Sequence, residues 1–290
     1  MENLTRLLLQ DVNYTYPDGT RAISNVSLGV AAGDFIGILG YNGSGKTTLL
    51  NVMDGLNKDF QGTVLLDGAD IRGLSPKEIY KKMGIVFQNP DDQLFASTVR
   101  EDVAFGPINM GFSKKEVARR VAAALKDINM EDSSGKPIHH LSFGQKKKIC
   151  IAGLLSMGHE ILLLDEPTAG LDPLGEYQMM SLLTRLNKEK GVTIVIATHS
   201  VDLVPLFINR LFVLSAGEIA RSGTPESVFT APEDMKGIRL RMPHIAELMY
   251  RLKHEDQLPF QNIPLTIGEA RQEMLRLFED RKAPCSAQAK

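Results

Sequence analysis

The stretch Gly40-Tyr41-Asn42-Gly43-Ser44-Gly45-Lys46-Thr47 fits G-x-x-x-x-G-K-[ST], the pattern of a phosphate-binding loop. An apolar run, Phe35 to Leu39, precedes it, and the apolar residues after it, Leu49, Leu50, Val52 and Met53, have a spacing that suits a helix. Glycines let backbone N–H groups approach an anion, and the helix N-terminus adds positive charge at the same point. We therefore expect the chain to bind a nucleoside triphosphate, with Lys46 reaching the β- and γ-phosphates and Thr47 ligating Mg²⁺.

Length and composition describe an ordinary globular protein. The chain has 290 residues, enough for one large domain or one domain with an appendage, of which 43% are hydrophobic and 23% charged. A net charge of −2 gives no general attraction to nucleic acid, so we expect no nucleic-acid partner. Cys150 and Cys285 lie far apart and indicate a reducing compartment. No apolar run approaches the ~18 residues of a membrane span, and Met1 to Leu9 makes a poor signal peptide, so we expect a cytoplasmic protein.

Strands that alternate with helices predict an α/β fold with a mostly parallel sheet covered on both faces. The predicted strands lie within 7–39, around a turn at Pro17-Asp18-Gly19, and at 62–67, 83–87, 161–164 and 193–197, with a hairpin over 210–219. The predicted helices lie between Phe112 and Lys126, with Ser113 as N-cap, and at 142–156 and 176–189.

The character of the chain changes after about residue 230. Prolines punctuate two predicted helices, 244–254 and 266–281, which indicates a small C-terminal appendage. We expect the last few residues to lack a fixed structure.

Polar residues follow several predicted buried strands. Gln88 follows Ile85 to Phe87, the acids Asp165 and Glu166 follow Ile161 to Leu164, and His199 follows Thr193 to Ala197. Ligands of open parallel sheets bind at the carboxyl ends of strands. If these strands are neighbours, the three sets of side chains converge with Lys46 on one phosphate site, where they would supply a metal carboxylate, a general base and a γ-phosphate sensor.

At Leu141-Ser142-Phe143-Gly144-Gln145 the chain carries a signature motif. With the phosphate-binding loop, Ile161 to Glu166 and Ala169-Gly170-Leu171-Asp172, the chain resembles the ATP-binding subunit of ABC transporters over roughly residues 5–230. Phe143 departs from the commoner glycine, which should leave Ser142 and the backbone of Gly144 undisturbed.

The resemblance implies a fold and a division into domains. Residues 1–230 would form an ABC-type P-loop ATPase domain, with a mostly parallel sheet, an antiparallel β subdomain and a helical signature subdomain at about 90–158. Residues 231–290 would form a small helical C-terminal domain and tail.

The resemblance also assigns roles to residues. Catalysis would fall to Glu166 as general base, His199 as switch histidine, Gln88 of the Q-loop and Lys46. Mg²⁺ would be held by Thr47, Gln88 and Asp165. The residues implied to bind ATP are Tyr16, which would stack on adenine, Gly40, Asn42, Gly43, Ser44, Gly45, Lys46, Thr47 and Thr48 of the Walker A loop, Ser142, Gly144 and Gln145 of the signature motif, and Asp172 of the D-loop.

The chain contains only one set of these motifs, which implies a functional unit of two chains. In this family two ATPase domains pair head to tail, and Ser142 of one would cap the nucleotide held by Lys46 of the other. The partner would be a second copy or a related ATPase, and ATP would hold the pair together until hydrolysis opens it.

Two further segments narrow the resemblance. Gln88 to Phe95 with Glu101 to Pro107, and the tail segments Arg239 to Leu248 and Leu265 to Arg271, are similar to the ATPases of energy-coupling-factor (ECF) importers, particularly the cobalt/nickel type. This implies a peripheral protein at the cytoplasmic face of the membrane, with a transmembrane coupling subunit and a substrate-capture subunit as partners. An ECF ATPase for a vitamin or a stand-alone exporter ATPase is the alternative.

Other readings of the same motifs are less favoured. A DNA-repair ATPase would carry a coiled-coil insertion between Thr47 and Ser142, where no sustained heptads occur, and an ATPase of translation would normally carry two nucleotide domains. A nucleotide-gated scaffold would not need Glu166 and His199.

Three groups of residues have simple explanations outside the site. We expect His139-His140 to be a solvated loop, Lys146-Lys147-Lys148 a solvated helix end, and Met179-Met180 with Cys150 packing residues. Leu94 and Phe95, by contrast, are expected to be exposed and to mark a docking surface for the membrane partner.

Overall fold

The structure is a computed structural model that describes residues 5–282. Cys285 and the terminal residues predicted to lack a fixed structure lie outside the described part. No helix among residues 5–282 is both long and apolar enough to cross a membrane.

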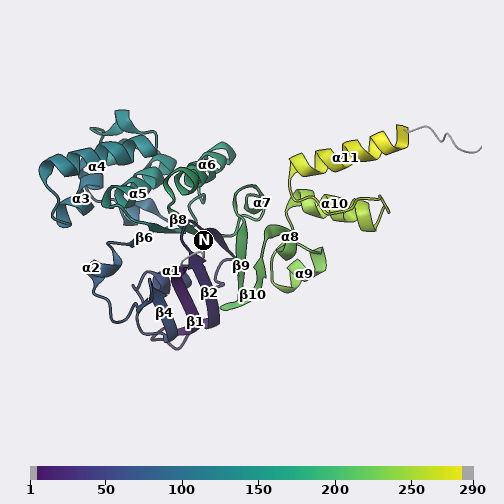
Figure 1. The fold of residues 1–290 in the computed structure, drawn as a ribbon, viewed down its shortest axis with the longest axis horizontal. Coiled ribbons are helices and arrows are strands. Elements are labelled where there is room, and N and C mark those ends of the chain that lie inside the picture. The colour runs from purple at the N-terminus through teal and green to yellow at the C-terminus, as the bar shows by residue number, and fades with distance from the viewer. Residues whose placement is uncertain (1–4, 283–290) are drawn as a thin grey trace, which may run out of the picture.

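A six-stranded sheet forms the centre of the molecule, in the order β10-β9-β3-β8-β7-β6 (Figure 1). Its strands are β3 (Phe35–Leu39), β6 (Met83–Val86), β7 (Ile161–Asp165), β8 (Thr193–Thr198), β9 (Arg210–Ser215) and β10 (Glu218–Gly223). The first five run parallel, and β10 pairs with β9 as an antiparallel edge strand. The predicted parallel sheet is therefore confirmed.

A separate antiparallel sheet, in the order β2-β1-β4-β5, packs below the central sheet in the view of Figure 1. Its strands are β1 (Thr5–Thr15), β2 (Arg21–Ala31), β4 (Gln61–Leu66) and β5 (Ala69–Asp70). The turn predicted at Pro17-Asp18-Gly19 connects β1 to β2. This sheet corresponds to the antiparallel β subdomain that the family resemblance implied.

Alternate residues of the central strands enter two different hydrophobic cores. Phe35 and Leu39 of β3 face a core with the helices, whereas Ile36 and Ile38 face a core with the antiparallel sheet. Because both faces are covered, the central strands are apolar along their whole length. Polar side chains that belong to the sheet are thereby confined to the strand ends.

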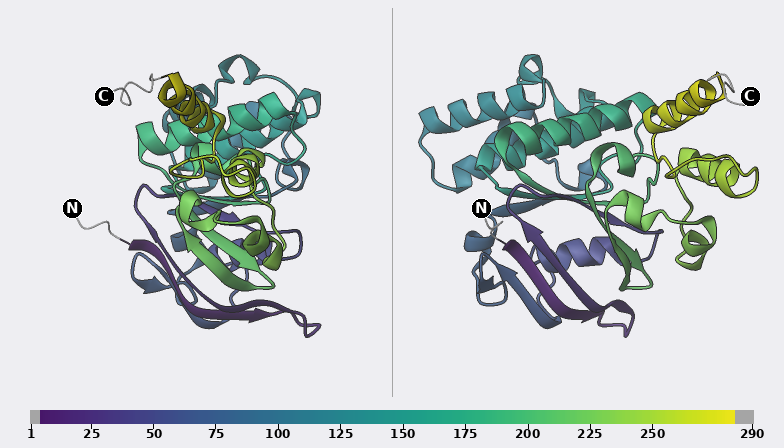
Figure 2. Two further views of the ribbon diagram at one scale, coloured as in Figure 1. Left: turned by 90° about the vertical axis from the view of Figure 1, so that its right-hand side faces the viewer. Right: turned by 45° about the vertical axis from the view of Figure 1, so that its right-hand side comes forward.

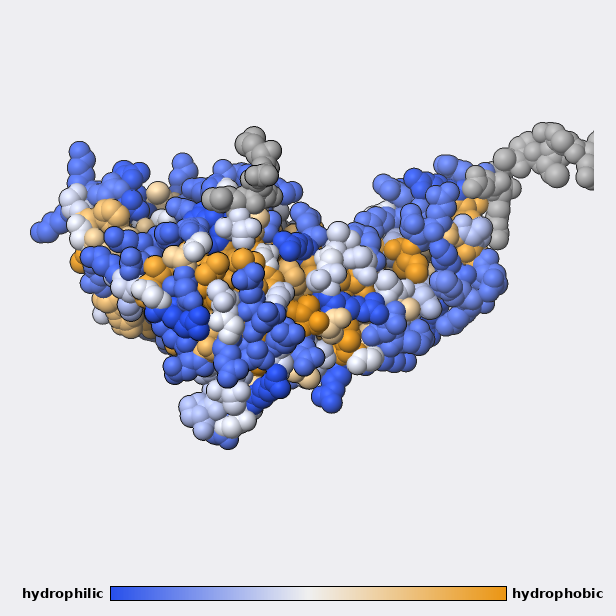
Figure 3. Space-filling model, turned by 60° about the horizontal axis from the view of Figure 1, so that its bottom comes forward, coloured by the Kyte–Doolittle hydropathy of each residue, from blue (hydrophilic) through white to orange (hydrophobic). Residues whose placement is uncertain are grey.

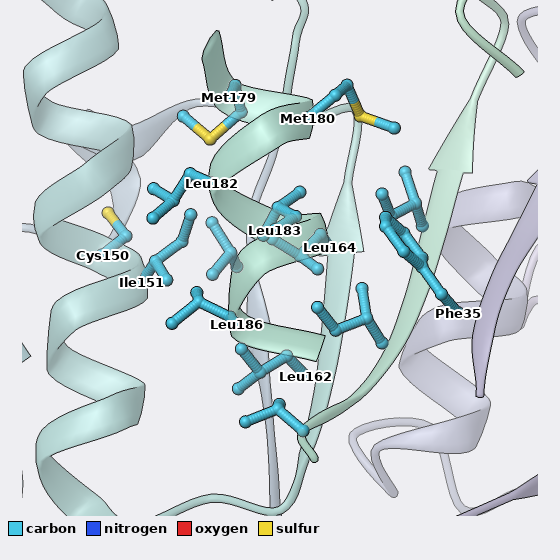
Figure 4. Packing of buried hydrophobic residues seen from close by; sticks show 14 of the residues in the cluster. Phe35, Cys150, Ile151, Leu162, Leu164, Met179, Met180, Leu182, Leu183 and Leu186 are labelled. Atoms are coloured by element: carbon cyan, nitrogen blue, oxygen red, sulfur yellow. The ribbon is translucent and has the colours of Figure 1, made fainter. Parts of the chain in front are cut away.

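Helices α5 (Phe143–Met157) and α6 (Pro173–Lys190) cover the face of the central sheet on which Phe35 and Leu39 lie. Figure 4 shows Cys150 and Ile151 of α5 against the leucines of α6, with Leu162 and Leu164 of β7 behind them. Cys150 is 3% exposed, and Met179 and Met180 are also buried, so their assignment as packing residues is confirmed. Burial raises the pKa of the Cys150 thiol to about 12.

The remaining helices before the C-terminal segment are shorter than α5 and α6, and two of them pack on α5 in the helical subdomain. These two are α3 (Val99–Asn109) and α4 (Lys114–Asp127); the others are α1 (Lys46–Met53), α2 (Pro76–Ile79) and α7 (Val204–Phe207), with 3₁₀ turns at Pro90–Asp92, Glu131–Ser133 and Ile138–His140. Ser113 caps α4 as predicted, by accepting a hydrogen bond from the Glu116 N–H.

Several short helices were not predicted, and two longer ones also differ from the sequence prediction. Helix α6 begins at Pro173 rather than 176, because the Asp172 carboxylate accepts from the Gly175 N–H and proline fits the first helical position. Helix α3 was not predicted, since Gly106 and Pro107 suggest a break. A reciprocal cap between Thr98 and Glu101 starts α3, and packing against α4 and α5 carries it through the proline.

The Lys146-Lys147-Lys148 prediction is wrong for Lys147. This residue lies in the second turn of α5, and its side chain is 1% exposed. Lys146 is mostly covered and forms an ion pair with Asp91 at 2.6 Å. A run of three lysines suggests solvation, but in a helix the three side chains point in different directions, and one of them faces the sheet.

The C-terminal segment lies at the opposite end of the molecule from α3 and α4 (Figures 1 and 2). It contains α8 (Pro225–Val228), α9 (Pro232–Gly237), α10 (His244–His254) and α11 (Ile267–Lys282), so both predicted C-terminal helices are present. Hydrophilic residues predominate on the face of this segment in Figure 3, as on the main body.

Polar contacts join the C-terminal segment to loops near the sheet edge. The Arg241 guanidinium forms an ion pair with Asp202, and the His244 N–H donates to the same carboxylate at 2.8 Å. The Arg239 guanidinium lies 5.3 Å from the centre of the Tyr41 ring. The segment is thus attached beside the loops that follow β3 and β8.

His159 is a buried histidine between α5 and β7. Its side chain is 4% exposed, and Nε2 donates to the carbonyl oxygen of Tyr80. Burial lowers the pKa of His159 below its ordinary value of 6.5. The folded protein therefore holds this ring neutral at pH values where an exposed ring takes up a proton.

As the pH falls from about 7.5 to about 5.5, we expect the free energy of unfolding of the wild-type protein to decrease. A His159→Gln variant should not show this decrease. As the pH falls through 6.5, the unfolded chain binds a proton that the folded chain does not, which costs up to about 1.4 kcal/mol per pH unit. The glutamine amide can still donate to Tyr80 but does not titrate. Urea unfolding at both pH values measures the difference, and equal pH slopes for the two proteins would contradict it.

Candidate functional site

Four neighbouring strands of the central sheet, β3, β8, β7 and β6, end at one edge. The phosphate-binding loop follows β3, His199 follows β8, Glu166 follows β7, and Gln88 comes two residues after β6. The strands are therefore neighbours, as the sequence analysis required. Their carboxyl ends bring the predicted side chains to one place.

The phosphate-binding loop leaves backbone donors free at the start of α1. Gly45 is the N-cap residue in a left-handed conformation, with φ of 106°, and no side chain caps the helix. A Cβ atom at Gly45 would lie 2.5 Å from the carbonyl oxygen of Ala22, so the loop requires glycine there. The uncapped N–H groups and the positive end of the helix form an anion site.

A cavity of about 570 Å³ opens beside this loop. Its walls bring together ten of the residues predicted to bind ATP or Mg²⁺ or to act in catalysis. They are Tyr16, Asn42, Gly43, Gly45, Lys46, Thr47, Thr48, Gln88, Asp165 and Glu166. The structure thus gathers most of the predicted nucleotide site into one cavity. Gly40 and Ser44 lie in the loop behind it, and a Cβ atom at Gly40 would lie 2.5 Å from Ser44 Oγ.

The Lys46 ammonium is buried at the base of the loop. It donates to the carbonyl oxygens of Gly40 at 2.9 Å and Tyr41 at 3.2 Å, and it lies 3.4 Å from Glu166 Oε1. A side chain that is 6% exposed and held by loop carbonyls is a positive charge fixed at the phosphate position.

The two acids after β7 are both buried. Thr47 Oγ1 donates to Asp165 Oδ2 at 2.6 Å, and burial raises the pKa of Asp165 above its ordinary value. Within residues 5–282, Asp165 Oδ1 and Glu166 Oε2 have no hydrogen-bond partner. Burial of an oxygen without a partner costs free energy, and both residues line the cavity, which can hold polar ligands.

Glu166 lies between a lysine and a histidine. Its Oε1 is 2.9 Å from His199 Nδ1, in addition to the contact with Lys46. Its backbone is left-handed, with φ of 47°, which is a strained conformation for a residue that has a Cβ atom. His199 is about half exposed and contacts the site through this carboxylate.

Tyr16 and Thr48 form the wall at the other end of the cavity. The Tyr16 hydroxyl is 2.8 Å from Thr48 Oγ1, and the ring packs edge-on against Tyr14. The ring remains 36% exposed, which leaves it able to stack on a flat ligand.

The signature residues occupy a second cavity, of about 450 Å³. Ser142, Gly144, Gln145 and Asp172 line it, and no residue of the phosphate-binding loop does. Ser142 and Gln145 cap the start of α5 reciprocally: Ser142 Oγ accepts from the Gln145 N–H, and Gln145 Oε1 accepts from the Ser142 N–H. These four predicted residues are thus grouped with one another but not with Lys46.

Sequence reasoning missed Lys147. Its Nζ donates to the carbonyl oxygens of Glu166 at 2.7 Å and Ala169 at 2.8 Å. The sequence offers no clear signal for this, because Lys147 sits in a run of lysines and its partners are backbone atoms distant along the chain.

Two predictions about the surface have different outcomes. His139 and His140 are exposed as expected, and residues 5–282 hold no group of three or more His, Cys, Asp or Glu arranged for a metal ion. Phe95 is 64% exposed, but Leu94 is partly buried against the core, so only Phe95 is as exposed as predicted.

Comparison with known proteins agrees with this geometry. The ABC transporter family profile matches residues 23–169. A Geobacter sulfurreducens protein provisionally named as an ABC transporter ATP-binding protein is 65% identical over 266 residues, which cover 92% of this chain and 95% of the relative. The energy-coupling factor transporter ATP-binding protein EcfA of Methanococcus maripaludis is 48% identical over 264 residues, 90% of this chain and 94% of the relative.

Solved structures show the same fold. The structure of cbiO1 from Clostridium perfringens, described as part of the ABC transporter complex cbiONQ, is 40% identical with a TM-score of 0.75, over 89% of this chain and 100% of that chain. A dimeric bacterial ABC transporter cassette is 32% identical with a TM-score of 0.67, over 76% of this chain and 98% of that chain. With the phosphate-binding loop, the paired acids and the signature motif all in place, the chain belongs to the ABC transporter family and is an ATP-hydrolysing, ATP-binding subunit of the energy-coupling factor type.

Proposed function

We propose that this chain powers the import of cobalt or nickel ions through a separate ECF-type membrane complex, as a peripheral subunit at the cytoplasmic face of the membrane. The observation that carries the ATPase role is the cavity in which Lys46, Asp165 and Glu166 converge. The likeness to cbiO1, part of an ABC transporter complex, supports the transport role. The metal substrate is supported by the segments after Gln88 and after Arg239, which are similar to the ATPases of cobalt/nickel importers. A vitamin is the alternative cargo, and export by a stand-alone ATPase is a second alternative.

The proposal includes a division of labour along the chain. Residues 1–230 act as the ATP-binding domain, in which about 90–158 form the helical subdomain that contains the signature motif. Residues 231–290 form a small C-terminal domain. The course of the described helices supports this division, since α3, α4 and α5 pack on one another and α10 contacts α11.

Several residues hold the nucleotide. Tyr16 stacks on adenine, and the loop Gly40 to Thr48 surrounds the phosphates with backbone N–H groups. Lys46 exchanges its contacts with the loop carbonyls for phosphate oxygens, which a buried ammonium bonds more strongly.

The residues present fit a Mg²⁺ ion. Thr47 and Asp165 already share a hydrogen bond, Asp165 Oδ1 is buried without a partner among the described residues, and Gln88 lines the same cavity. These three residues would hold the ion, which when bound neutralises charge on the phosphate oxygens.

Glu166 acts as general base. His199 and Lys46 both contact Oε1, which fixes the carboxylate, while Oε2 is buried and has no partner within residues 5–282. Glu166 lines the cavity, and we infer that its carboxylate takes the proton from the attacking water once ATP is bound. His199 reaches the γ-phosphate from the outer side of Glu166 and responds to its presence.

Two chains complete the site. Ser142, Gly144, Gln145 and Asp172 lie on a cavity that the phosphate loop does not reach, so in a single chain they cannot contact the ATP held by Lys46. In a head-to-tail dimer the start of α5 of one chain caps the γ-phosphate in the other. The dimeric form of a similar cassette supports this arrangement. The second chain is a copy of this one or a related ATPase.

An exposed apolar surface suits the membrane partner. We call Phe95, Phe105 and Ile108 the Phe95 surface; they are 64%, 48% and 58% exposed, and the two phenyl rings pack edge to face at 4.6 Å. The Asp102 carboxylate accepts from the N–H groups of Phe95 and Ala96, which fixes the turn that presents Phe95. We propose that a cytoplasmic helix of the transmembrane coupling subunit docks here.

Pull-down of the native complex, with uptake assays in vesicles, tests the proposed function. We expect two membrane subunits to co-purify and ATP to drive cobalt or nickel uptake; uptake of a vitamin alone would contradict the metal assignment.

A Phe95→Glu variant should keep basal ATPase activity but lose about 10-fold or more in assembly and uptake, because a charge cannot replace an aromatic side chain that becomes buried when the partner helix docks. Leu206→Glu, at a leucine of α7 that is 50% exposed, is the control.

We expect Glu166→Gln to abolish steady-state hydrolysis while ATP binding remains within a few-fold. Loss of a general base costs about 10²–10⁴-fold, roughly 3–5 kcal/mol in the barrier, whereas Lys46 and the loop amides still hold the phosphates. Phosphate release and equilibrium ATP binding measure the two effects, with the exposed Glu189→Gln as control. Near-normal hydrolysis by Glu166→Gln would remove Glu166 from this role.

Mixing Lys46→Ala with Ser142→Ala should restore activity above the sum of the separate variants. A mixed dimer contains one composite site with both intact residues, because Lys46 and Ser142 of the same site come from different chains. ATPase assays after subunit exchange measure the recovery. If mixed dimers form without any recovery, either the sites are not shared or hydrolysis needs both sites intact.

A further inference from the structure

Lys147 places a buried positive charge directly beneath the proposed catalytic glutamate. Its side chain is 1% exposed, and within residues 5–282 it forms no ion pair with a carboxylate. Its Nζ is held by the carbonyl oxygens of Glu166 and Ala169, and it lies 5.2 Å from the centre of the Phe143 ring. Burial of an ammonium group costs free energy unless such dipoles surround it. Burial also lowers the pKa of Lys147 to about 8.

The two carbonyl oxygens belong to the turn that orients Glu166. The Ala169 N–H donates to the Glu166 carbonyl at 3.1 Å, and the Glu166 N–H donates to Ala197 of β8 at 2.9 Å. Lys147 thus adds a clamp across the turn from Glu166 to Ala169. The left-handed φ of Glu166 persists only if its surroundings hold it there.

Lys147 also connects two parts of the chain that act on different ATP molecules in the proposed dimer. It lies on α5, whose first residues form the signature motif, and its partners lie on the segment between β7 and α6. Phe143 of the signature motif reaches the same segment, since its ring would lie 3.0 Å from a Cβ atom on Gly170. A displacement of α5 is therefore passed to the backbone of Glu166.

We propose that Lys147 is a positioning residue: it clamps the backbone of Glu166 so that the carboxylate faces the phosphate site, and it links that carboxylate to the signature helix of the same chain. The inference rests on the proposed role of Glu166 as general base. In the dimer, closure of the signature helix on the partner's nucleotide adjusts Glu166 at the chain's own site. The state of one ATP site therefore affects hydrolysis at the other.

Substitution of Lys147 separates positioning from binding. Lys147→Met removes both hydrogen bonds at similar side-chain length, and we expect kcat to fall about 10- to 100-fold while the Kd for ATP changes less than about threefold. Lys147→Gln retains amide donors and should recover part of kcat. Lys115→Met, at an exposed lysine of α4, should behave as wild type. We also expect a Hill coefficient for ATP closer to one in Lys147→Met.

The outcomes decide the inference independently of the proposed function. A normal kcat in Lys147→Met, or a loss of kcat that only parallels lost ATP binding and a lowered melting temperature in both Lys147 variants, would overturn the positioning role. If Lys147→Met does not fold, a wild-type kcat in a folded Lys147→Gln together with unchanged cooperativity overturns it, and a selective fall in kcat supports it. Hydrolysis by Glu166→Gln at the normal rate would instead refute the base assignment itself.

Discussion

The order β3-β8-β7-β6 of the central sheet is the constraint on which the site depends. Parallel neighbours end at the same edge, and both faces of these strands are buried in apolar cores. Polar side chains cannot be accommodated within the strands, so they follow them. Lys46, Asp165, Glu166 and His199 therefore meet at one edge although they are spread over about half of the chain.

Burial gives this edge its electrostatic character. Lys46, Lys147, Asp165 and Glu166 are each no more than 6% exposed, so two positive and two negative side chains share a region of low dielectric constant. Burial disfavours the charged forms of Asp165 and Lys147: it raises the pKa of Asp165 and lowers the pKa of Lys147. Removal of Lys46 or Glu166 leaves the charge of the other uncompensated, which makes this pair sensitive to substitution.

The separation of the two cavities explains why the motifs of one chain are divided. The phosphate loop and the paired acids line one cavity, and the signature residues line the other. Ser142 and Gln145 cap each other, so the start of α5 is preformed without a ligand. Lys147 spans from this helix to the backbone of Glu166 and so connects the two regions directly.

The sequence by itself determined the phosphate-binding loop, the signature motif, the apolar strands and the residues that end them, because these depend on local spacing and on which residue types a buried strand tolerates. It also determined the ATPase family. The tertiary structure alone decided that Lys147 is buried, that α3 continues through Gly106 and Pro107, and that Leu94 packs inward while Phe95 does not. Those outcomes depend on contacts between segments distant in the chain, and local propensity is too weak to resist such packing.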